Sequence, residues 1–299
     1  MKSMNMKSMI MKPRRHFLTT LGASTLALSL RHVSLGQGTS EAMKIALLSD
    51  THLHAEPSHE YRSFRPYDNL VQASKEVLAS EAKFAMLCGD AARLDGKKED
   101  YVQLKKLLEP ITSKMKMEIA LGNHDDRANF WTVFKDRPID KTLSGKKHVS
   151  VADLGPQRWI VLDSLMYVDK TPGFLGKEQR DWLDKFLGSD LTRPVVLMVH
   201  HTLGQRDGDL LDTERLLAIA NKHPNVKAIV FGHSHQWRIE QREKLWLINL
   251  PALGYNFADD QPIGWVKAEL RTNELLLTLS VIGGNKTDHD KTQTLKWLT

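Results

Sequence analysis

Five short blocks of polar residues each come directly after an apolar run of the sequence. They are Ser49-Asp50-Thr51-His52, Gly89-Asp90, Gly122-Asn123-His124-Asp125, His200-His201 and Gly232-His233-Ser234-His235. Carboxylate, imidazole and amide groups suit zinc, iron, manganese or cobalt, and the absence of cysteine from the blocks argues against a thiolate site. Two histidines at positions i and i+2 of an extended segment point the same way, so they can bind one metal or two neighbouring metals. The blocks therefore predict a metal centre with oxygen and nitrogen ligands.

The order of the blocks is more informative than any single block. A Gly-Asp pair alone is usually a turn, and Gly-Asn-His alone is usually a loop with a polar cap. Glycine at positions 89, 122 and 232 lets the backbone turn sharply where side chains have to converge. Because every block follows an apolar run, the sequence predicts that all five meet at one edge of a sheet.

The elements that must position these blocks alternate along the chain. Apolar runs predict buried strands at residues 44–48, 84–88, 118–121, 195–199 and 228–231. Helical periodicity predicts helices at residues 68–79, 99–108, 177–187 and 212–221. Such alternation indicates an α/β fold, in which sites lie at the carboxyl ends of the strands.

The chain after residue 236 has a different pattern, because predicted strands follow one another there without helices. These strands are at residues 237–241, 244–248, 265–270 and 275–282, and residues 148–154 and 158–162 indicate a hairpin. Two sheets packed face to face, with helices outside, accommodate both halves of the chain. The aromatic residues of this region could line a pocket, although such residues more often belong to the core: they are Trp237, Trp246, Tyr255, Phe257 and Trp265.

The composition places the chain among globular proteins. Its 299 residues are 41% hydrophobic with one Cys, which excludes collagenous, disordered and disulfide-scaffold classes. Six of the 42 basic residues lie in residues 1–36, where there is no acidic residue, so 36 basic and 36 acidic residues remain in the rest. The formal charge of +6 therefore belongs to the leader, and we predict no nucleic-acid partner.

Residues 1–36 have the features of an export signal. Arg14-Arg15 precedes a mildly apolar run at residues 17–30, which is too short to span a membrane. The paired arginines resemble a twin-arginine signal. We therefore expect residues 1–36 to direct export to the periplasm or the extracellular space, and residues 37–299 to form one domain without a transmembrane segment. The alternatives are a disordered basic tail or a wrongly chosen start codon.

The five blocks together resemble the pattern of the calcineurin-like metallophosphoesterase superfamily, which is D-x-H, G-D, G-N-H-[DE], H and G-H-x-H. The resemblance covers residue 43 to about residue 282 and implies a four-layer α/β/β/α sandwich. Leu175-Gly176-Lys177-Glu178-Gln179 and the His200-His201 pair look most similar to the cyclic-nucleotide phosphodiesterase branch.

The resemblance also implies a role for each polar residue. Asp50, His52 and His235 would hold one metal ion, Asn123, His200 and His233 would hold a second, and Asp90 would bridge the two. The implied ions are divalent or trivalent manganese, iron or zinc, and a metal-bound hydroxide would attack the phosphorus of a phosphate mono- or diester. Asn123 and His124 would also face the substrate, with His124 as a catalytic group that Asp125 orients.

Several assignments stay open in the sequence. Thr202-Leu203 replaces the two prolines usual in that branch, so either His200 or His201 could be the ligand, with His200 favoured. Arg93 could bind a substrate phosphate or simply begin a helix, and Arg127 has the same two interpretations. His54 and His59 are expected to be solvated loop histidines. Residues 55–67, 202–210 and 255–262 are the loops expected to set specificity.

Two other functions compete with phosphate-ester hydrolysis. Asp50-Thr51-His52-Leu53-His54 also fits the opening of TIM-barrel amidohydrolases, although that interpretation leaves the blocks at 122–125 and 232–235 unexplained. A phosphoesterase fold could also serve as a binding scaffold without catalysis, but all seven ligand positions and His124 are present. The sequence leaves the natural substrate, the metal and the oligomeric state open.

Overall fold

The apolar runs form two six-stranded sheets in the computed structural model, which describes residues 42–135 and 147–298. The first sheet has the order β12-β11-β10-β1-β2-β3, in which β1, β2 and β3 are parallel and the last three strands of the chain are antiparallel additions. Its strands are β1 (Met43–Leu48), β2 (Phe84–Cys88), β3 (Lys116–Ala120), β10 (Pro262–Leu270), β11 (Glu274–Gly284) and β12 (Thr292–Lys296).

The second sheet has the order β4-β5-β6-β7-β9-β8, and β5, β6, β7 and β9 are parallel to one another. The strands β4 and β8 pair antiparallel at its two edges. Its strands are β4 (Ser150–Leu154), β5 (Gln157–Leu162), β6 (Val195–Val199), β7 (Val226–Phe231), β8 (Arg238–Arg242) and β9 (Leu245–Asn249). The second half of the chain thus supplies strands to both sheets.

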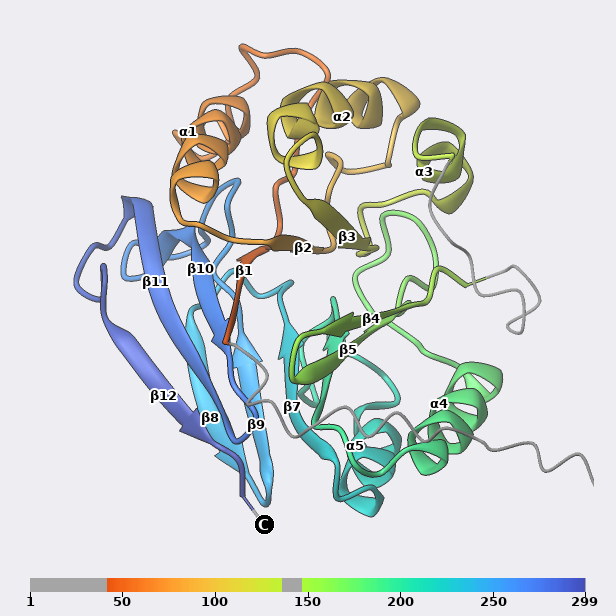
Figure 1. Cartoon of the computed structure of the whole chain (residues 1–299). Helices are drawn as coiled ribbons and strands as arrows, with labels where there is room; N and C mark the ends of the chain where they lie inside the picture. The colour runs from red at the N-terminus through yellow and green to blue at the C-terminus, as the bar shows by residue number, and fades with distance from the viewer. Residues whose placement is uncertain (1–41, 136–146, 299) are drawn as a thin grey trace, which may run out of the picture. The chain divides into compact units, whose positions relative to one another are not determined.

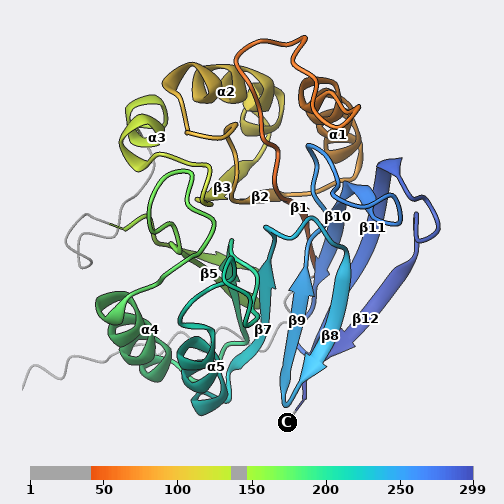
Figure 2. The ribbon, with the colours of Figure 1, turned by 180° about the vertical axis from the view of Figure 1, so that it is seen from behind.

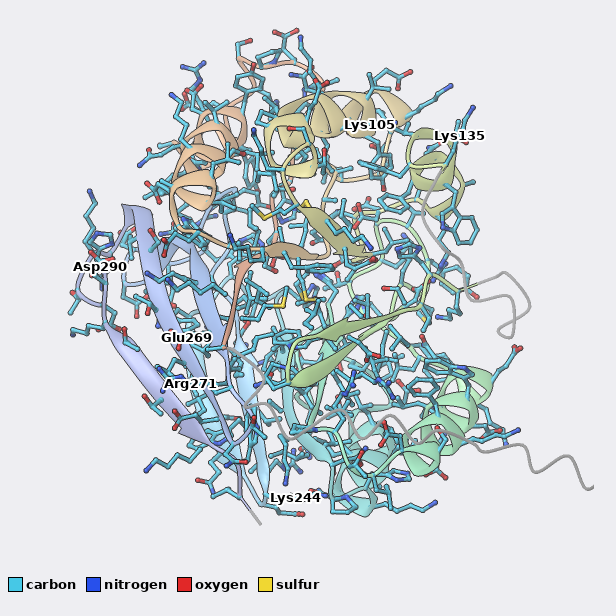
Figure 3. The ribbon with its side chains drawn as sticks, in the orientation of Figure 1. Lys105, Lys135, Lys244, Glu269, Arg271 and Asp290 are labelled. Carbon is cyan, nitrogen blue, oxygen red and sulfur yellow. The ribbon has the colours of Figure 1, made fainter. Side chains whose placement is uncertain are left out.

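Helices cover the outer face of each sheet, as the two opposite views show (Figures 1 and 2). On the first sheet these are α1 (Pro66–Ala79), α2 (Lys98–Thr112) and α3 (Arg127–Val133), and on the second sheet they are α4 (Lys177–Ser189) and α5 (Thr213–Lys222). Side chains fill the layers, whereas charged groups such as Lys105 and Lys135 point outward (Figure 3).

The alternation of side chains along each strand creates three apolar layers. In β1, Ile45 and Leu47 belong to the core between the two sheets, and Ala46 and Leu48 belong to the core beneath α1 and α2. In β6, Val196 faces the central core while its neighbours on either side pack against α4 and α5. Because each of these strands is buried on both faces, it has a continuous apolar sequence, which explains why these strands were predictable.

The four-layer α/β/β/α prediction is confirmed. The TIM-barrel alternative is wrong, because the described strands form two open sheets of mixed direction instead of one closed parallel barrel. The short helix α3 and the edge strand β12 were not predicted. The predicted export signal lies outside the described residues and stays a prediction. Within residues 42–135 and 147–298, no helix has the length and apolar character that a bilayer span needs.

Candidate metal centre

The five polar blocks meet at one edge of the sheets, directly after β1, β2, β3, β6 and β7. Sharp turns place them there, because five of the seven candidate ligands have positive φ: Asp50 (51°), His52 (43°), Asp90 (44°), His233 (70°) and His235 (55°). Such a backbone costs about 1–3 kcal/mol for a residue other than glycine, and it clusters at functional sites. The turns also bring the blocks into close contact, since a Cβ atom at Gly122 would overlap the Asp90 carboxylate.

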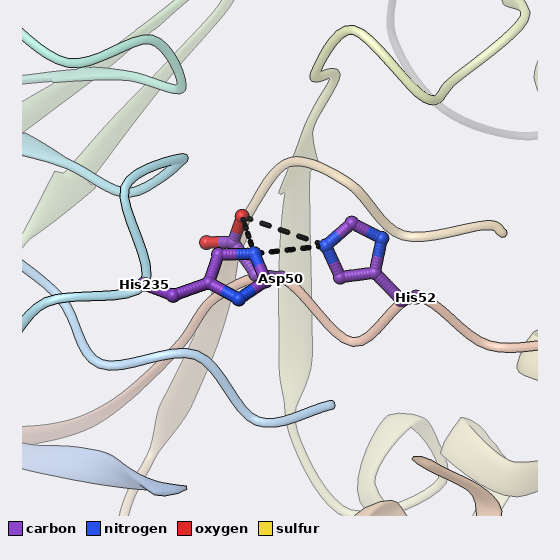
Figure 4. Close-up of side chains that lie close together, drawn as sticks. All are labelled: Asp50, His52 and His235. Carbon is purple, nitrogen blue, oxygen red and sulfur yellow. Dashed lines mark hydrogen bonds and ion pairs between the residues drawn. The ribbon is translucent and has the colours of Figure 1, made fainter. Parts of the chain in front are cut away.

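Asp50, His52 and His235 form the first cluster (Figure 4). The Nε2 atoms of His52 and His235 lie 3.0 Å apart, and Asp50 Oδ1 lies 3.4 Å from His235 Nε2 and 3.9 Å from His52 Nε2. All three side chains are buried. Two imidazole nitrogens and a carboxylate oxygen that converge in this way are suitable ligands for one cation.

Asp90, His200 and His233 form the second cluster. Asp90 Oδ1 lies 3.4 Å from His200 Nε2, whereas Asp90 Oδ2 lies 3.6 Å from His52 Nε2 in the first cluster. The carboxylate of Asp90 therefore has one oxygen beside each cluster. This is the arrangement expected of a ligand shared by two metal ions.

Backbone carbonyls fix the orientation of three imidazole rings. Cys88 O lies 2.8 Å from His200 Nδ1, and Tyr255 O lies 2.6 Å from His235 Nδ1, so both rings direct Nε2 at the centre. Gly208 O lies 3.0 Å from His233 Nε2, which leaves Nδ1 of that ring as the possible ligand atom. Carbonyl partners of this kind hold the N–H tautomer that leaves the other nitrogen free to bind a metal.

The residues present fit a pair of metal ions. Asn123 Oδ1 and His200 Nε2 are buried and have no hydrogen-bond partner among the described residues. His200 Nε2 lies 3.4 Å from Asp90 Oδ1, and Asn123 lines the same hollow as Asp90. Buried polar atoms are normally satisfied, so these two atoms are explained by a ligand that accepts their lone pairs. The donor set of carboxylate, amide and imidazole is one that manganese, iron and zinc use.

The charges of the centre also favour cations. Burial alone would raise the pKa of Asp50, but the charge of His200 and the hydrogen bond with His235 outweigh it and lower this pKa to about 2. Burial would lower the pKa of His200, yet the charges of Asp90 and Asp50 raise it to about 10. His200 likewise lowers the pKa of Asp90 against the effect of burial, so both carboxylates are ionised and attract positive charge. A cation bound at His200 Nε2 would supply that charge in place of the proton on this nitrogen.

The structure separates His200 from His201. Both rings are fully buried, but His200 faces Asp90 while His201 Nδ1 lies 2.7 Å from Ser164 Oγ, and His201 is absent from the clusters. The His201 ring packs against the rings of His200 and His233, with centroids 5.0 and 4.8 Å away, and no ion pair joins it to Asp50 or Asp90 among the described residues. The geometry favours His200 as the ligand.

The hydrogen bonds of Asp125 do not include the ring of His124, so the expected orienting role of Asp125 stays a prediction. The Asp125 carboxylate accepts hydrogen bonds from the backbone N–H groups of Ala91, Ala92 and Gly122 and from the Tyr101 hydroxyl. Burial and the charge of Asp90 raise the pKa of Asp125 to about 6, although the backbone N–H groups oppose this shift. Asp125 therefore ties together the loops after β2 and β3 and acts as a positioning residue.

His124 lies at the edge of the clusters and faces the hollow beside them. Its Nδ1 atom is 2.8 Å from Leu94 O and 3.4 Å from Asp169 Oδ1, and its backbone N–H donates to Asp90 Oδ1 over 2.9 Å. The side chain is 20% exposed, unlike the buried ligand histidines. Because Leu94 holds Nδ1, the Nε2 atom is available to a substrate.

The hollow beside the clusters, which we call the metal hollow, has a volume of about 480 Å³. It is lined by His52, Asp90, Asn123, His124, Thr171, Thr202, Arg206, Gly208, Asp209, His233, Ser234, His235, Gln236, Tyr255 and Phe257. Two of the three predicted specificity loops, residues 202–210 and 255–262, contribute to it. Of the five late aromatic residues, Tyr255 and Phe257 line it, whereas Trp237 and Trp246 pack against the central core and Trp265 belongs to the core beneath α1 and α2. Arg206 lies in the predicted loop at residues 202–210, whereas Thr171 was missed, because a loop threonine carries no periodic signal.

The two arginines left open in the sequence lie outside the metal hollow. Arg93 is 9% exposed, and its guanidinium stacks 4.5 Å from the centre of the Tyr61 ring, so the structure does not support the predicted contact with substrate. Arg127 binds both carboxylate oxygens of Asp163, at 2.6 and 2.7 Å. Both arginines therefore have structural contacts within the fold.

Loss of the Arg127–Asp163 pair is expected to destabilise the fold. Burial would raise the pKa of Asp163, but the hydrogen bond and charge of Arg127 lower it. Breaking a buried pair leaves an uncompensated charge, so Asp163→Asn should lower the free energy of unfolding in urea by about 3 kcal/mol at neutral pH. The stabilisation by the ionised Asp163 carboxylate is complete above about pH 3.9, the pKa of Asp in the unfolded chain. It is lost as the pH falls through the lower pKa that Asp163 has in the folded protein.

The exposed pair of Arg158 and Asp153 offers a matched control, since the Asp153 side chain is 50% exposed. Asp153→Asn should cost less than about 1 kcal/mol, because exposed pairs are screened by solvent. Equal losses for the two variants at neutral pH would show that the buried pair contributes no more than a surface pair.

Comparison with known proteins identifies the family. A model of the calcineurin-like phosphoesterase family matches residues 43–237. A probable cyclic nucleotide phosphodiesterase from Synechococcus sp. is 29% identical over 78% of this chain and 89% of its own length. The 3′,5′-cyclic adenosine monophosphate phosphodiesterase CpdA of Pseudomonas aeruginosa is 24% identical over 74% of this chain and 79% of its own.

A solved structure has the same fold. The dimetal phosphatase from Danio rerio superposes with a TM-score of 0.66 at 14% sequence identity, over 86% of this chain and 99% of that one. At this identity the likeness concerns the fold alone, whereas the family model covers most of the chain, including all five polar blocks. The chain belongs to the calcineurin-like phosphoesterase family.

Proposed function

We propose that this protein is a metal-dependent hydrolase of phosphoric esters, with phosphodiesters as its substrates. The observation that carries the proposal is the Asp90 carboxylate, which has one oxygen 3.4 Å from His200 Nε2 and the other 3.6 Å from His52 Nε2. Two ligand clusters that share a carboxylate can hold two cations side by side. The names of the two curated relatives, both phosphodiesterases, support a diester substrate.

Some residues of the chain would bind the metal ions, and His124 would transfer a proton. Asp50, His52 and His235 would hold one ion, and Asn123, His200 and His233 would hold the other. When bound, such a pair of ions would supply positive charge for the phosphate and for the attacking and leaving oxygens. His124 faces the same hollow, with Nδ1–H donating to Leu94 O. When the ring carries a second proton on Nε2, it can pass that proton to the oxygen that leaves as the P–O ester bond breaks, and the ring returns to its neutral form.

Removal of metal is expected to abolish activity. Dialysis against a chelator should reduce hydrolysis of bis(p-nitrophenyl) phosphate to the uncatalysed rate, and added manganese, zinc or iron should restore it. The melting temperature should fall on dialysis and recover with metal, because a ligand that binds only the folded state stabilises it by mass action. Chelator that has been saturated with metal beforehand is the control and should change neither quantity.

The non-catalytic scaffold gives a different result in the same experiment. A scaffold would regain its melting temperature with metal but hydrolyse neither p-nitrophenyl phosphate nor its bis-ester with any of the three metals. A protein that hydrolyses the bis-ester equally well after metal removal would contradict the proposed mechanism.

A further inference from the structure

A second hollow adjoins the metal hollow on the side of strand β8, and we call it the side hollow. It has a volume of about 200 Å³ and shares five residues with the metal hollow: Thr202, Arg206, Asp209, Ser234 and Gln236. The two hollows are therefore neighbours across the segment that carries His233 and His235. A molecule bound at the metal ions could extend past Ser234 and Gln236 into the side hollow.

The side hollow has an apolar floor and polar walls. Leu203, Phe231 and Leu247 are nearly buried and line it. The antiparallel pairing of β8 and β9 places Arg238 opposite Asn249 and Glu240 opposite Leu247, which brings all four side chains to one face of the two strands. A flat ring could lie on the apolar floor while its polar edge meets the walls.

Asn249 lines this hollow and has a buried, unused hydrogen-bond acceptor. The residue is 5% exposed, its Nδ2 group donates to Ser234 Oγ, and its Oδ1 atom has no partner among residues 42–135 and 147–298. A buried acceptor without a partner costs about 1–3 kcal/mol. Because Asn249 lines the side hollow, a ligand that donates an N–H to Oδ1 would remove this cost.

The charges around the side hollow balance. Arg238 forms an ion pair with Glu240 at 2.7 Å, and the Asp209 carboxylate accepts the backbone N–H of Arg206. Two basic and two acidic side chains thus surround the hollow, which favours an uncharged occupant over a second phosphate. The volume lies below the roughly 300–1,000 Å³ of pockets for drug-sized ligands, so it suits a single ring system.

We propose that the side hollow binds the second ester group of the phosphodiester substrate, and that this group carries an uncharged flat heterocycle with an N–H donor for Asn249 Oδ1. The inference depends on the proposed function, because the phosphate must first bind at the metal centre. Asn249 would then be a specificity residue: it binds the alcohol that stays attached to phosphorus and does not contact the P–O bond that breaks.

Three p-nitrophenyl phosphodiesters test the proposal: the thymidin-5′-yl, the N3-methylthymidin-5′-yl and the methyl ester. Water adds to phosphorus and p-nitrophenol leaves in each case, so only the retained alcohol differs. The base of the first ester has an N–H donor, the second has lost it but keeps the sugar hydroxyl, and the third lacks both. The parent protein should show kcat/KM about tenfold higher for the thymidinyl than for the N3-methylated ester, as one hydrogen bond provides.

Asn249→Ala should remove this tenfold preference and leave kcat/KM for the methyl ester within twofold. Asn225→Ala is a matched control, since Asn225 is also buried, uses Nδ2 in one hydrogen bond and has an unpartnered Oδ1 among the described residues, but does not line the side hollow. Asn225→Ala should keep the preference. Should Asn249→Ala not fold, Gln205→Trp narrows the side hollow from its exposed rim and should lower kcat/KM for both nucleoside esters about fivefold or more.

The outcomes separate the two proposals. No hydrolysis of any ester by the parent protein with any metal would overturn the proposed function itself. Hydrolysis of all three esters with no preference for the N–H donor, or an equal loss on all three in Asn249→Ala, would overturn the role of Asn249 alone. A preference for both nucleoside esters over the methyl ester that is insensitive to N3-methylation would show that the hollow binds the nucleoside without a hydrogen bond to Asn249, and would overturn the proposed N–H donor.

Discussion

The Asp90→Asn variant is expected to hydrolyse bis(p-nitrophenyl) phosphate more than about 100-fold more slowly than the parent protein. Replacing a residue that only supports a metal ligand typically costs about 10–100-fold, and a residue shared by two clusters should cost more. Asn keeps the size of the side chain, and its Oδ1 can still accept the backbone N–H of His124. The variant therefore removes the negative charge and leaves the geometry of the loop in place.

The metal content of this variant provides a second readout. Asp90 lies beside both clusters, so the bound metal per chain should fall from about two toward one or none. Asp95→Asn is the matched control, because Asp95 lies in the same loop after β2, its side chain is 51% exposed and its ion-pair partner is Lys97. The control should retain activity within twofold and its full metal content.

An Asp90→Asn protein as active as the parent, with unchanged metal, would refute the shared-ligand assignment. Loss of activity with two metal ions still bound would show instead that the charge of Asp90 is needed for the reaction and not for metal binding. Circular dichroism of the variant should match the parent, since the residue is buried but lies in a loop.

The core of this fold was predictable because its strands are buried on both faces. Strands β2 and β6 lie where the apolar runs placed them, and the polar blocks follow them directly. Helix α3 was missed because it has seven residues and only Phe130 of them is buried, so it carries little periodic signal. Strand β12 was missed because it is an edge strand with four exposed residues and one buried leucine.

The candidate site was predictable in composition but not in its contacts. The residue types and their places after strands indicated which side chains converge. The partners of Asp125 were not predictable, because Tyr101 lies 24 residues away on a helix and the other donors are backbone N–H groups. The choice between His200 and His201 required the direction of each side chain, which the spacing of two adjacent histidines does not contain.

Replacing His124 by Ala should lower kcat by about 10²- to 10⁴-fold, the range typical for loss of a positioned proton donor. His124 also groups with His52 and Asp90, but it belongs neither to the cluster of Asp50, His52 and His235 nor to that of Asp90, His200 and His233. Both clusters stay complete in the variant, so its metal content should stay near that of the parent protein. His54→Ala is the matched control, because His54 lies on the loop after β1 and does not line the metal hollow. It should keep activity within about threefold.

The loss of kcat in His124→Ala should depend on the leaving group of the ester. p-Nitrophenol departs readily as an anion and needs little help, whereas an alkyl alcohol must receive a proton as the P–O bond breaks. His124→Ala should therefore impair hydrolysis of a dialkyl phosphate much more than hydrolysis of a p-nitrophenyl ester of the same alcohol. Because Leu94 O holds Nδ1 of His124, only Nε2 is placed to deliver that proton. Equal losses on the two esters, with metal retained, would contradict proton donation and assign His124 to stabilising charge on the phosphate.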